Sequence, residues 1–232
     1  MLYRLTKSKF ILGLQCEKAL YLDTYSPHLA YYPPETLARF RRGRDFEAKV
    51  KALFPNGIDI SQRLGRNIQQ YPTLTAQLLS SQTEINLYEA AFVYNEVLVL
   101  ADVVHKDIDG TISVYEIKNS TSVKEVFQRD VSLQHYVISN ALATTLQHTC
   151  GHLASFQILY NDGNDNPLHE ELLPHARQTE PLIASQVERL QQVLQGLEPN
   201  IEPGPQCSAP YECPFLRYCA RRITTQLELL AT

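Results

Sequence analysis

The sequence contains no run of about 18 to 20 consecutive apolar residues, the length that a helix needs to cross a membrane. It also lacks internal repeats and low-complexity tracts. The amino terminus is basic, but the apolar stretch after it, Phe10 to Leu14, is too short for a signal peptide. These absences predict a globular protein that works in the cytoplasm.

An excess of positive charge is also absent, because the formal net charge is −4 at pH 7. A chain with this charge is not attracted to nucleic acid as a whole, so such binding would need a local basic patch. The candidate patch is a short arginine-rich run that contains Arg39, Arg41, Arg42 and Arg44. The alternative is that these arginines form an ordinary solvated helix face.

The composition, 44% apolar and 20% charged, is that of a chain with one sizeable core. The apolar periodicity predicts helices over 8–22, 35–54, 72–82, 122–145 and 178–197. Runs rich in β-branched residues predict strands over 84–94, 97–106, 111–118 and 152–160. Ser8 is the expected N-cap of the first helix, and Phe46, Val50, Leu53 and Phe54 form the apolar stripe of the second. This order predicts an α/β core, a mixed central sheet flanked by helices.

The two strands around a turn at Gly110 are expected to form a β-hairpin. Glu116 and Lys118 point the same way, because strand side chains alternate between faces. A two-residue loop would place Asp102 opposite Ile117, on the other face. A three-residue loop that ends in a glycine bulge would place Asp102 opposite Glu116. In that case two carboxylates and an ammonium share one patch.

Two carboxylates beside an ammonium suit the hydrolysis of a phosphodiester. Hard cations such as Mg²⁺ bind through one or two carboxylates and keep several waters. The metal polarises the phosphate and lowers the pKa of a bound water. Lys118 would orient that water or stabilise charge on the phosphate oxygens. The alternative is a hairpin with a surface ion pair of little consequence.

The cysteines form a second pattern. Cys207, Cys213 and Cys219 follow one another at five-residue intervals, and Cys16 lies far upstream. Disulfides are not expected in a reducing cytosol, so clustered thiols indicate a metal or a catalytic site. Structural zinc sites generally use closer pairs, so a [4Fe–4S] cluster fits better. Zn²⁺ and unliganded buried thiols are the alternatives. Cys150 stands apart and is expected to be a buried apolar residue.

In the order of its motifs the chain resembles the PD-(D/E)XK nuclease superfamily, in its RecB-like branch. Within that branch it looks like the iron–sulfur exonucleases of the CRISPR-adaptation type. The resemblance runs from Ser8 to Cys219. It rests on the opening segment, the helix with Gly43 and Glu47, the hairpin, the segment Asp130-x-x-x-Gln134-x-Tyr136 and the cysteines.

The resemblance implies a hydrolase, a Mg²⁺- or Mn²⁺-dependent deoxyribonuclease that acts as an exonuclease on single-stranded DNA ends. It also implies that 1–34 and 198–232 come together as a cysteine-cluster region beside a nuclease core of 35–197. CRISPR-adaptation or repair proteins are the expected partners. The alternative function is a non-catalytic nucleic-acid-binding or adaptation scaffold subunit that carries a cluster or zinc.

The resemblance assigns roles to individual residues. The catalytic set is Asp102, Glu116, Lys118, Gln134 and Tyr136, and the metal-binding positions are Glu47, Asp102, Glu116 and Ile117. Gly43 is expected to let its helix approach the sheet. Asp130 is a weaker supporting candidate. Glu89, on the strand before the hairpin, could help the site, but its position favours an exposed strand residue.

The match departs from the family pattern in three places. A histidine often occupies the position of Glu47 in these nucleases. Their Gln-x-x-x-Tyr motif fits imperfectly, because Gln134 lies two residues before Tyr136. They also commonly have two residues between the first pair of the cysteine trio, where this chain has five.

Overall fold

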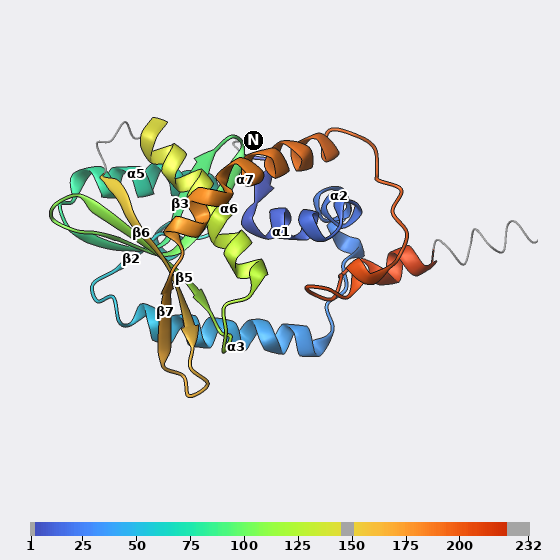
Figure 1. Cartoon of the computed structure of the whole chain (residues 1–232), viewed down its shortest axis with the longest axis horizontal. Helices are drawn as coiled ribbons and strands as arrows, with labels where there is room; N and C mark the ends of the chain where they lie inside the picture. The colour runs from blue at the N-terminus through green and yellow to red at the C-terminus, as the bar shows by residue number, and fades with distance from the viewer. Residues whose placement is uncertain (1–2, 145–150, 222–232) are drawn as a thin grey trace, which may run out of the picture. The chain divides into compact units, whose positions relative to one another are not determined.

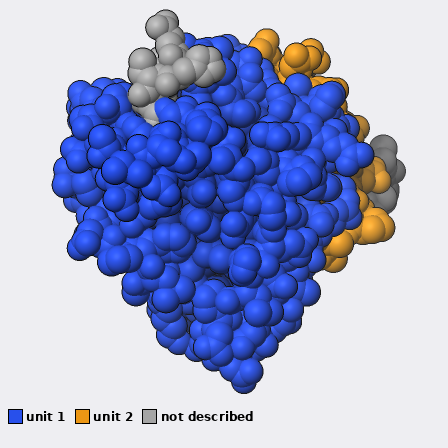
Figure 2. All heavy atoms as spheres, turned by 60° about the vertical axis from the view of Figure 1, so that its left-hand side comes forward, with its two compact units in different colours: residues 1–7, 39–184 blue, residues 8–38, 185–232 orange. Residues whose placement is uncertain are grey.

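The computed structural model describes residues 3–144 and 151–221. The chain forms two compact units, coloured separately in Figure 2. The first consists of the chain up to Lys7 together with Arg39–Ala184, and the second of Ser8–Ala38 together with the chain from Ser185 onward. The expected division into a cluster region and a core of 35–197 stays a prediction.

A seven-stranded mixed sheet organises the first unit (Figure 1). Its order is β2-β3-β4-β5-β6-β7, and β1 pairs with β4 in addition. The pairs β1–β4, β2–β3 and β5–β6 are parallel and the others antiparallel. The strands are β1 Leu5–Thr6, β2 Ile58–Asp59, β3 Ile85–Tyr94, β4 Val97–Lys106, β5 Thr111–Lys118, β6 His152–Asn161 and β7 Pro167–Glu171. The expected α/β fold with a mixed sheet is confirmed.

The α-helices include α1 Lys7–Gln15, α2 Glu17–Tyr25, α3 Pro34–Lys51, α4 Ile60–Leu64, α5 Tyr71–Ser81, α6 Glu125–Thr144 and α7 Leu173–Val193, and 216–221 is also helical. Short 3₁₀ turns occur at η1 Pro27–Leu29, η2 Ile68–Gln70 and η3 Pro205–Cys207. Among the described residues, no helix is both long and apolar enough to span a membrane.

Two helix predictions were wrong. The first helix breaks at Cys16, whose backbone is extended (φ −161°, ψ 116°) and forms the N-cap of α2. Ser8 therefore lies inside α1 instead of capping it. Leu53 is 61% exposed, because α3 ends at Lys51 and the helical period no longer applies beyond it.

The sheet lies between α3 and α6. Phe46 and Val50 of α3 pack against Ile117 of β5. The neighbouring side chain on β5, Glu116, accepts a hydrogen bond from Gln134 of α6. Because successive strand residues face opposite ways, α3 and α6 cover opposite faces of the sheet.

The β4–β5 turn settles where Asp102 lies. The Asp107 N–H donates to the Thr111 carbonyl across a three-residue loop, and Gly110 ends that loop with φ +84°. Of the two possible loops, this is the one that places Asp102 opposite Glu116.

Strands β4 and β5 separate at this point. β3 pairs with β4 along its whole length, so β1 and β5 must share the other edge of β4. The β4–β5 ladder ends at the pair of Val103 with Tyr115, after which β5 continues beside β6. The Asp102 carboxylate accepts a hydrogen bond from the Ile117 N–H at 2.7 Å. We call this place the β4–β5 fork.

Candidate metal centre

Three neighbouring strands each bring one carboxylate to the β4–β5 fork. Glu116 of β5 lies across from Asp102 of β4, because the pairs next to them are in register. On the other side of β4, the pairs that flank Glu89 place it across from Asp102 as well. The three acids therefore form one row across the sheet.

Glu89 interrupts its strand. Its φ is +53°, a left-handed conformation that few non-glycine residues adopt, and the β3–β4 pairing skips it. Such a conformation costs about 1–3 kcal/mol and clusters at functional sites, although Asn56, Asn95, Glu96 and Asp165 of this chain adopt it elsewhere. The Glu89 carboxylate accepts a hydrogen bond from Lys51 of α3 at 2.7 Å.

Helix α3 adds a further carboxylate. Oxygens of Glu47, Glu89 and Asp102 all lie within 4.8 Å of one another, and the three side chains are partly buried. Lys51 pairs with Glu47 at 2.5 Å and with Glu89. Carboxylates gathered this closely could hold a divalent cation such as Mg²⁺.

Glu116 is the most buried acid at the fork, with 1% of its surface exposed. Its carboxylate accepts hydrogen bonds from Gln134 Nε2 at 2.7 Å, from Lys7 Nζ at 3.0 Å to each oxygen, and from Lys118 Nζ. Burial opposes ionisation, but the two ammonium groups and the hydrogen bonds outweigh it and hold the pKa of Glu116 below its usual range. Glu116 is therefore ionised.

Lys118 connects Glu116 to α6. Its Nζ donates to the Asp130 carboxylate at 2.6 Å. Burial lowers the pKa of Lys118, yet Asp130, Glu116 and Asp102 together raise it well above the usual value. Burial also raises the pKa of Asp130. The ammonium of Lys118 is thus protonated at any physiological pH.

The protonation state of Asp102 differs from that of Glu116. Burial and the neighbouring Glu116 charge raise the pKa of Asp102 to about 8, although Lys7 and Lys118 act in the opposite direction. At neutral pH the fork therefore holds one ionised and one largely protonated carboxyl.

Lys7 and Lys51 were missed at the level of sequence. Lys51 stands four residues after Glu47, a spacing that indicates a helical ion pair, so this contact had a visible signal. Lys7 directly follows β1 and reaches acids more than 90 positions away, which no local pattern indicates. The expectation that Glu89 is an exposed strand residue was wrong, because its side chain is partly buried against Lys51.

One buried polar atom at the centre has no hydrogen-bond partner in the part of the chain that the structure describes. Gln134 is fully buried, and its Nε2 donates to Glu116 and, at 3.4 Å, to Asp130. Its other side-chain atom, Oε1, makes no hydrogen bond to the described residues. Buried polar atoms of this kind usually have a water or an ion as a partner.

Other expected site residues lie differently. The Tyr136 hydroxyl accepts a hydrogen bond from Asn95, and its ring packs edge-on against Tyr94, near the β3–β4 turn. It stands two positions from Gln134, which is nearly the opposite side of a helix. The Ile117 side chain faces α3, and only its backbone contacts Asp102. The catalytic role of Tyr136 and the metal role of Ile117 stay predictions.

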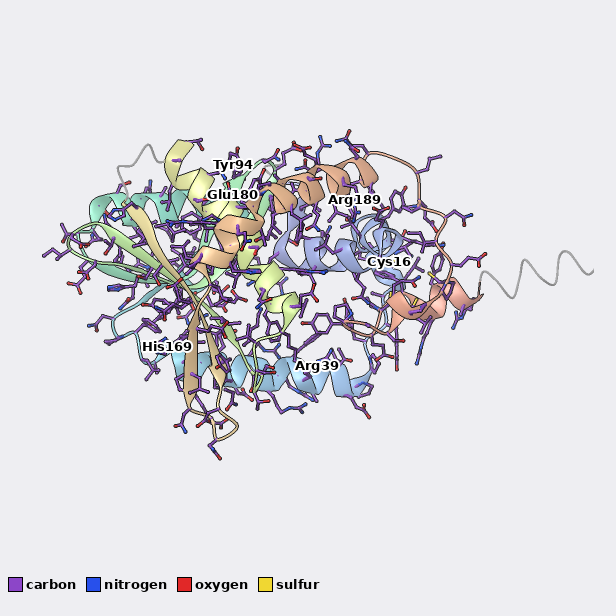
Figure 3. All side chains as sticks on the ribbon, viewed as in Figure 1. Cys16, Arg39, Tyr94, His169, Glu180 and Arg189 are labelled. Atoms are coloured by element: carbon purple, nitrogen blue, oxygen red, sulfur yellow. The ribbon has the colours of Figure 1, made fainter. Side chains whose placement is uncertain are left out.

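The arginine run lies on exposed turns of α3, where Figure 3 labels Arg39. The Asn119 side chain, next to Lys118, donates to the Arg42 carbonyl at 3.0 Å. The expected packing role of Gly43 was wrong. A Cβ built at Gly43 would meet no heavy atom of the described residues within 4 Å, apart from its own helix backbone and chain neighbours.

The four cysteines of the second pattern come together in the second unit. Cys207 and Cys213 belong to a buried apolar cluster around Phe215, and Cys16 and Cys219 pack against it. Cys16, labelled in Figure 3, lies at the break between α1 and α2. Burial, with added repulsion from the other thiols, raises the pKa of Cys213 to about 11. All four are free thiols, and Cys150 lies outside the described residues.

Comparisons with known proteins give only distant likenesses. No family model and no curated protein matches the sequence. The crystal structure of SSO0001 is 14% identical, covers 94% of this chain and 85% of that chain, and has a TM-score of 0.47. The alkaline exonuclease LHK-Exo from Laribacter hongkongensis is 10% identical, covers 80% and 93%, and has a TM-score of 0.31. These likenesses assign no function to this chain.

Asp102 makes the stability of the metal-free protein depend on pH. Its pKa is about 8 in the folded protein and about 3.9 in an unfolded chain, so the folded state binds the extra proton between these values. The free energy of unfolding should fall as the pH rises through this range. Asp102→Asn keeps an acceptor for Ile117 and should be more stable than the wild type at about pH 8, by more than about 1 kcal/mol.

Urea unfolding in EDTA at several pH values measures this difference. Asp109→Asn is the control, because the pKa of the exposed Asp109 is lowered by its hydrogen bonds to Thr111. In that variant the dependence of the free energy of unfolding on pH should be the same as in the wild type above about pH 5. The prediction would be contradicted if the free energies of unfolding of the wild type and Asp102→Asn changed in parallel with pH.

Proposed function

We propose that this protein is a metal-dependent nuclease that hydrolyses phosphodiester bonds of DNA, as an exonuclease acting on single-stranded ends. The observation that carries the proposal is the β4–β5 fork. There, Asp102 stands across from the buried Glu116, and Lys118 contacts Glu116 and Asp130. The preference for single-stranded ends comes from the family resemblance alone.

The residues present fit a divalent cation. Five carboxylates and three ammonium groups meet at the centre, which leaves an excess of negative charge when all are ionised. The donors are hard oxygens, which Mg²⁺ and Mn²⁺ prefer. The unpartnered Gln134 Oε1 gives a metal-bound water an acceptor. Asp102, Glu47 and Glu116 would hold the ion, and Glu89 is added to the expected ligands.

A bound Mg²⁺ would polarise the phosphate and supply a water of lowered pKa. The ammonium of Lys118 stays protonated, so it acts as a donor to a phosphate oxygen or to the attacking water, and does not abstract a proton. Asp130 and Gln134 position Lys118 and Glu116 from the α6 side.

The exposed arginines of α3 provide a surface for the phosphate backbone. Phe40 is 44% exposed, with the Arg39 guanidinium carbon 5.9 Å from its ring centroid, and offers an aromatic side chain on which a base can stack. Phe40, Gly43 and Glu47 lie on one side of the helix, at helical spacings of three and four residues. The open position at Gly43 leaves room for a strand to pass along this side toward Glu47.

Replacing Lys118 tests the chemistry. Lys118→Ala should lower the cleavage rate at least about a hundredfold, because it removes a charge that acts on the reacting phosphate. The fold and DNA binding should persist. Asp102→Ala should lose activity together with metal, and EDTA should stop wild-type cleavage until Mg²⁺ or Mn²⁺ is restored.

Cleavage of end-labelled single strands, duplexes and circles measures these effects and tests the end preference. Lys49→Met is a matched control, because the ion pair of Lys49 with Asp165 is more than half exposed. Full activity of a folded Lys118→Ala protein would remove Lys118 from the mechanism.

Charge reversal of Arg41 and Arg42 tests the binding surface. The double variant should bind DNA more weakly whatever the sequence, and its affinity should depend less steeply on salt because fewer counterions are released. Arg129→Glu, which breaks an exposed helical ion pair with Glu125, is the control. Fluorescence anisotropy at several salt concentrations measures both quantities. An unchanged salt slope would leave the arginines as a solvated helix face.

We also propose that Cys16, Cys207, Cys213 and Cys219 hold a [4Fe–4S] cluster. Four thiols packed on one apolar cluster form a donor set of the right chemistry. The raised pKa of Cys213 reflects burial and thiol repulsion, and a cationic centre would favour the thiolates instead. The cluster would join segments distant in the sequence and act as a structural link. Zn²⁺ is the alternative occupant.

Protein purified without oxygen should be brown and contain about four irons per chain. Cys→Ala at any of the four positions should bleach the colour and lower the melting temperature, because metal binding is linked to folding. Cys150→Ala is the control and should do neither. Elemental analysis distinguishes the occupants: stoichiometric zinc without iron would overturn the iron–sulfur assignment.

A further inference from the structure

Lys7 pairs with two of the carboxylates proposed to hold a divalent cation, Glu116 and Asp102, so the role inferred for it rests on the metal-dependent function proposed for this site. Its Nζ lies 3.0 Å from both oxygens of Glu116 and 4.0 Å from Asp102 Oδ1. Lys118 shares its ammonium between Glu116 and Asp130. Lys7 is therefore the cation placed between the two acids of the fork.

The backbone fixes Lys7 in this position. Leu5 and Thr6 pair with β4 along the edge that β5 has left, and Leu5 is completely buried. The Arg4 and Leu5 N–H groups both donate to the Glu96 carbonyl, at 2.7 and 3.2 Å. Lys7 is the next residue, so its side chain enters the fork from an anchored strand.

The charges explain why an ammonium is needed there. An ionised carboxylate as buried as Glu116 is strongly destabilising unless it is paired. Lys7 satisfies both Glu116 oxygens without a metal. Asp102 and Glu116 would ligate a metal through these same oxygens, so the ammonium and the ion compete.

We propose that Lys7 is a built-in counter-ion that a divalent cation displaces from Glu116, and that the displaced ammonium then contacts the phosphate to be cleaved. The proposal gives the Lys7 side chain two opposite effects, one on metal binding and one on the reaction. Lys7 weakens metal binding, yet it assists the reaction once the metal is bound. A residue that only stabilised the fold would not do both.

Lys7→Met in the full-length protein tests the first effect, because methionine keeps most of the apolar stem and removes the charge. The metal-free variant should bind Mn²⁺ about tenfold more tightly than the wild type, which is about 1.4 kcal/mol. Electron paramagnetic resonance of free Mn²⁺ measures the affinity without reference to activity. Lys49→Met, at an exposed ion pair, should bind Mn²⁺ as the wild type does.

The second effect is tested at saturating Mn²⁺, where kcat of Lys7→Met should fall about tenfold or more on a single-stranded substrate. Lys7→Gln is made in parallel, because its amide still donates to Glu116 and keeps the variant folded if methionine does not. Circular dichroism confirms folding for both.

Unchanged or weaker Mn²⁺ binding by the folded Lys7 variants would overturn the counter-ion role. An unchanged kcat at saturating Mn²⁺ would overturn the phosphate contact. A wild-type protein that binds no Mn²⁺ would instead overturn the proposed metal-dependent function, so the two failures are distinguishable.

Discussion

The candidate site depends on the burial of one ionised carboxylate, that of Glu116. A buried carboxylate keeps its charge only where cations and donors replace its lost hydration. Here Lys7, Lys118 and Gln134 fill that role, and each comes from a different element: the first residue of α1 directly after β1, β5 itself and α6. Removing Glu116 would leave two partly buried lysines without their shared partner, so the acid and its donors depend on one another.

The sheet topology makes this arrangement possible. If β5 paired with β4 along its whole length, the Ile117 N–H would be used in the ladder and no place would exist for Lys7. Because β5 turns toward β6 instead, the edge of β4 is free to accept β1, and the Asp102 carboxylate caps the released amide. The fork is thus a break in strand pairing at which a side chain replaces the lost ladder bond.

Much of this could be predicted from the sequence. Strands β4 and β5 were predicted with their bounds, because β-branched runs around a glycine turn are a strong local signal. The sequence does not decide whether Asp102 lies on the same face as Glu116, because a two-residue and a three-residue loop are both possible and a one-residue difference moves a side chain to the other face. The ladder and the hydrogen bond between Asp107 and Thr111 settle it.

What the sequence did not reveal depends on distant or unpatterned contacts. Lys7 reaches the site only through the pairing of β1 with β4, a long-range contact without periodicity. The break at Cys16 carries no glycine or proline to mark it. Strand β7 was missed because four of its five residues are exposed, so it has no apolar alternation. The positive φ of Glu89 likewise has no sequence signature.

Three locally destabilising features occur on elements that contribute to the site. Glu89 adopts a backbone conformation that costs about 1–3 kcal/mol. Gly43 lies inside a helix, which costs about 1 kcal/mol relative to alanine, and no contact in the described chain requires it. Gln134 Oε1 is buried without a partner among the described residues.

Unfavourable local features of this kind, in backbone conformation, helix propensity or hydrogen bonding, tend to occur where function constrains a structure. Under the function proposed above, each feature would have a specific explanation: a ligand turned toward Asp102, an open path along α3 and an acceptor for a metal-bound water. A sheet edge carrying only a structural ion pair would explain none of the three.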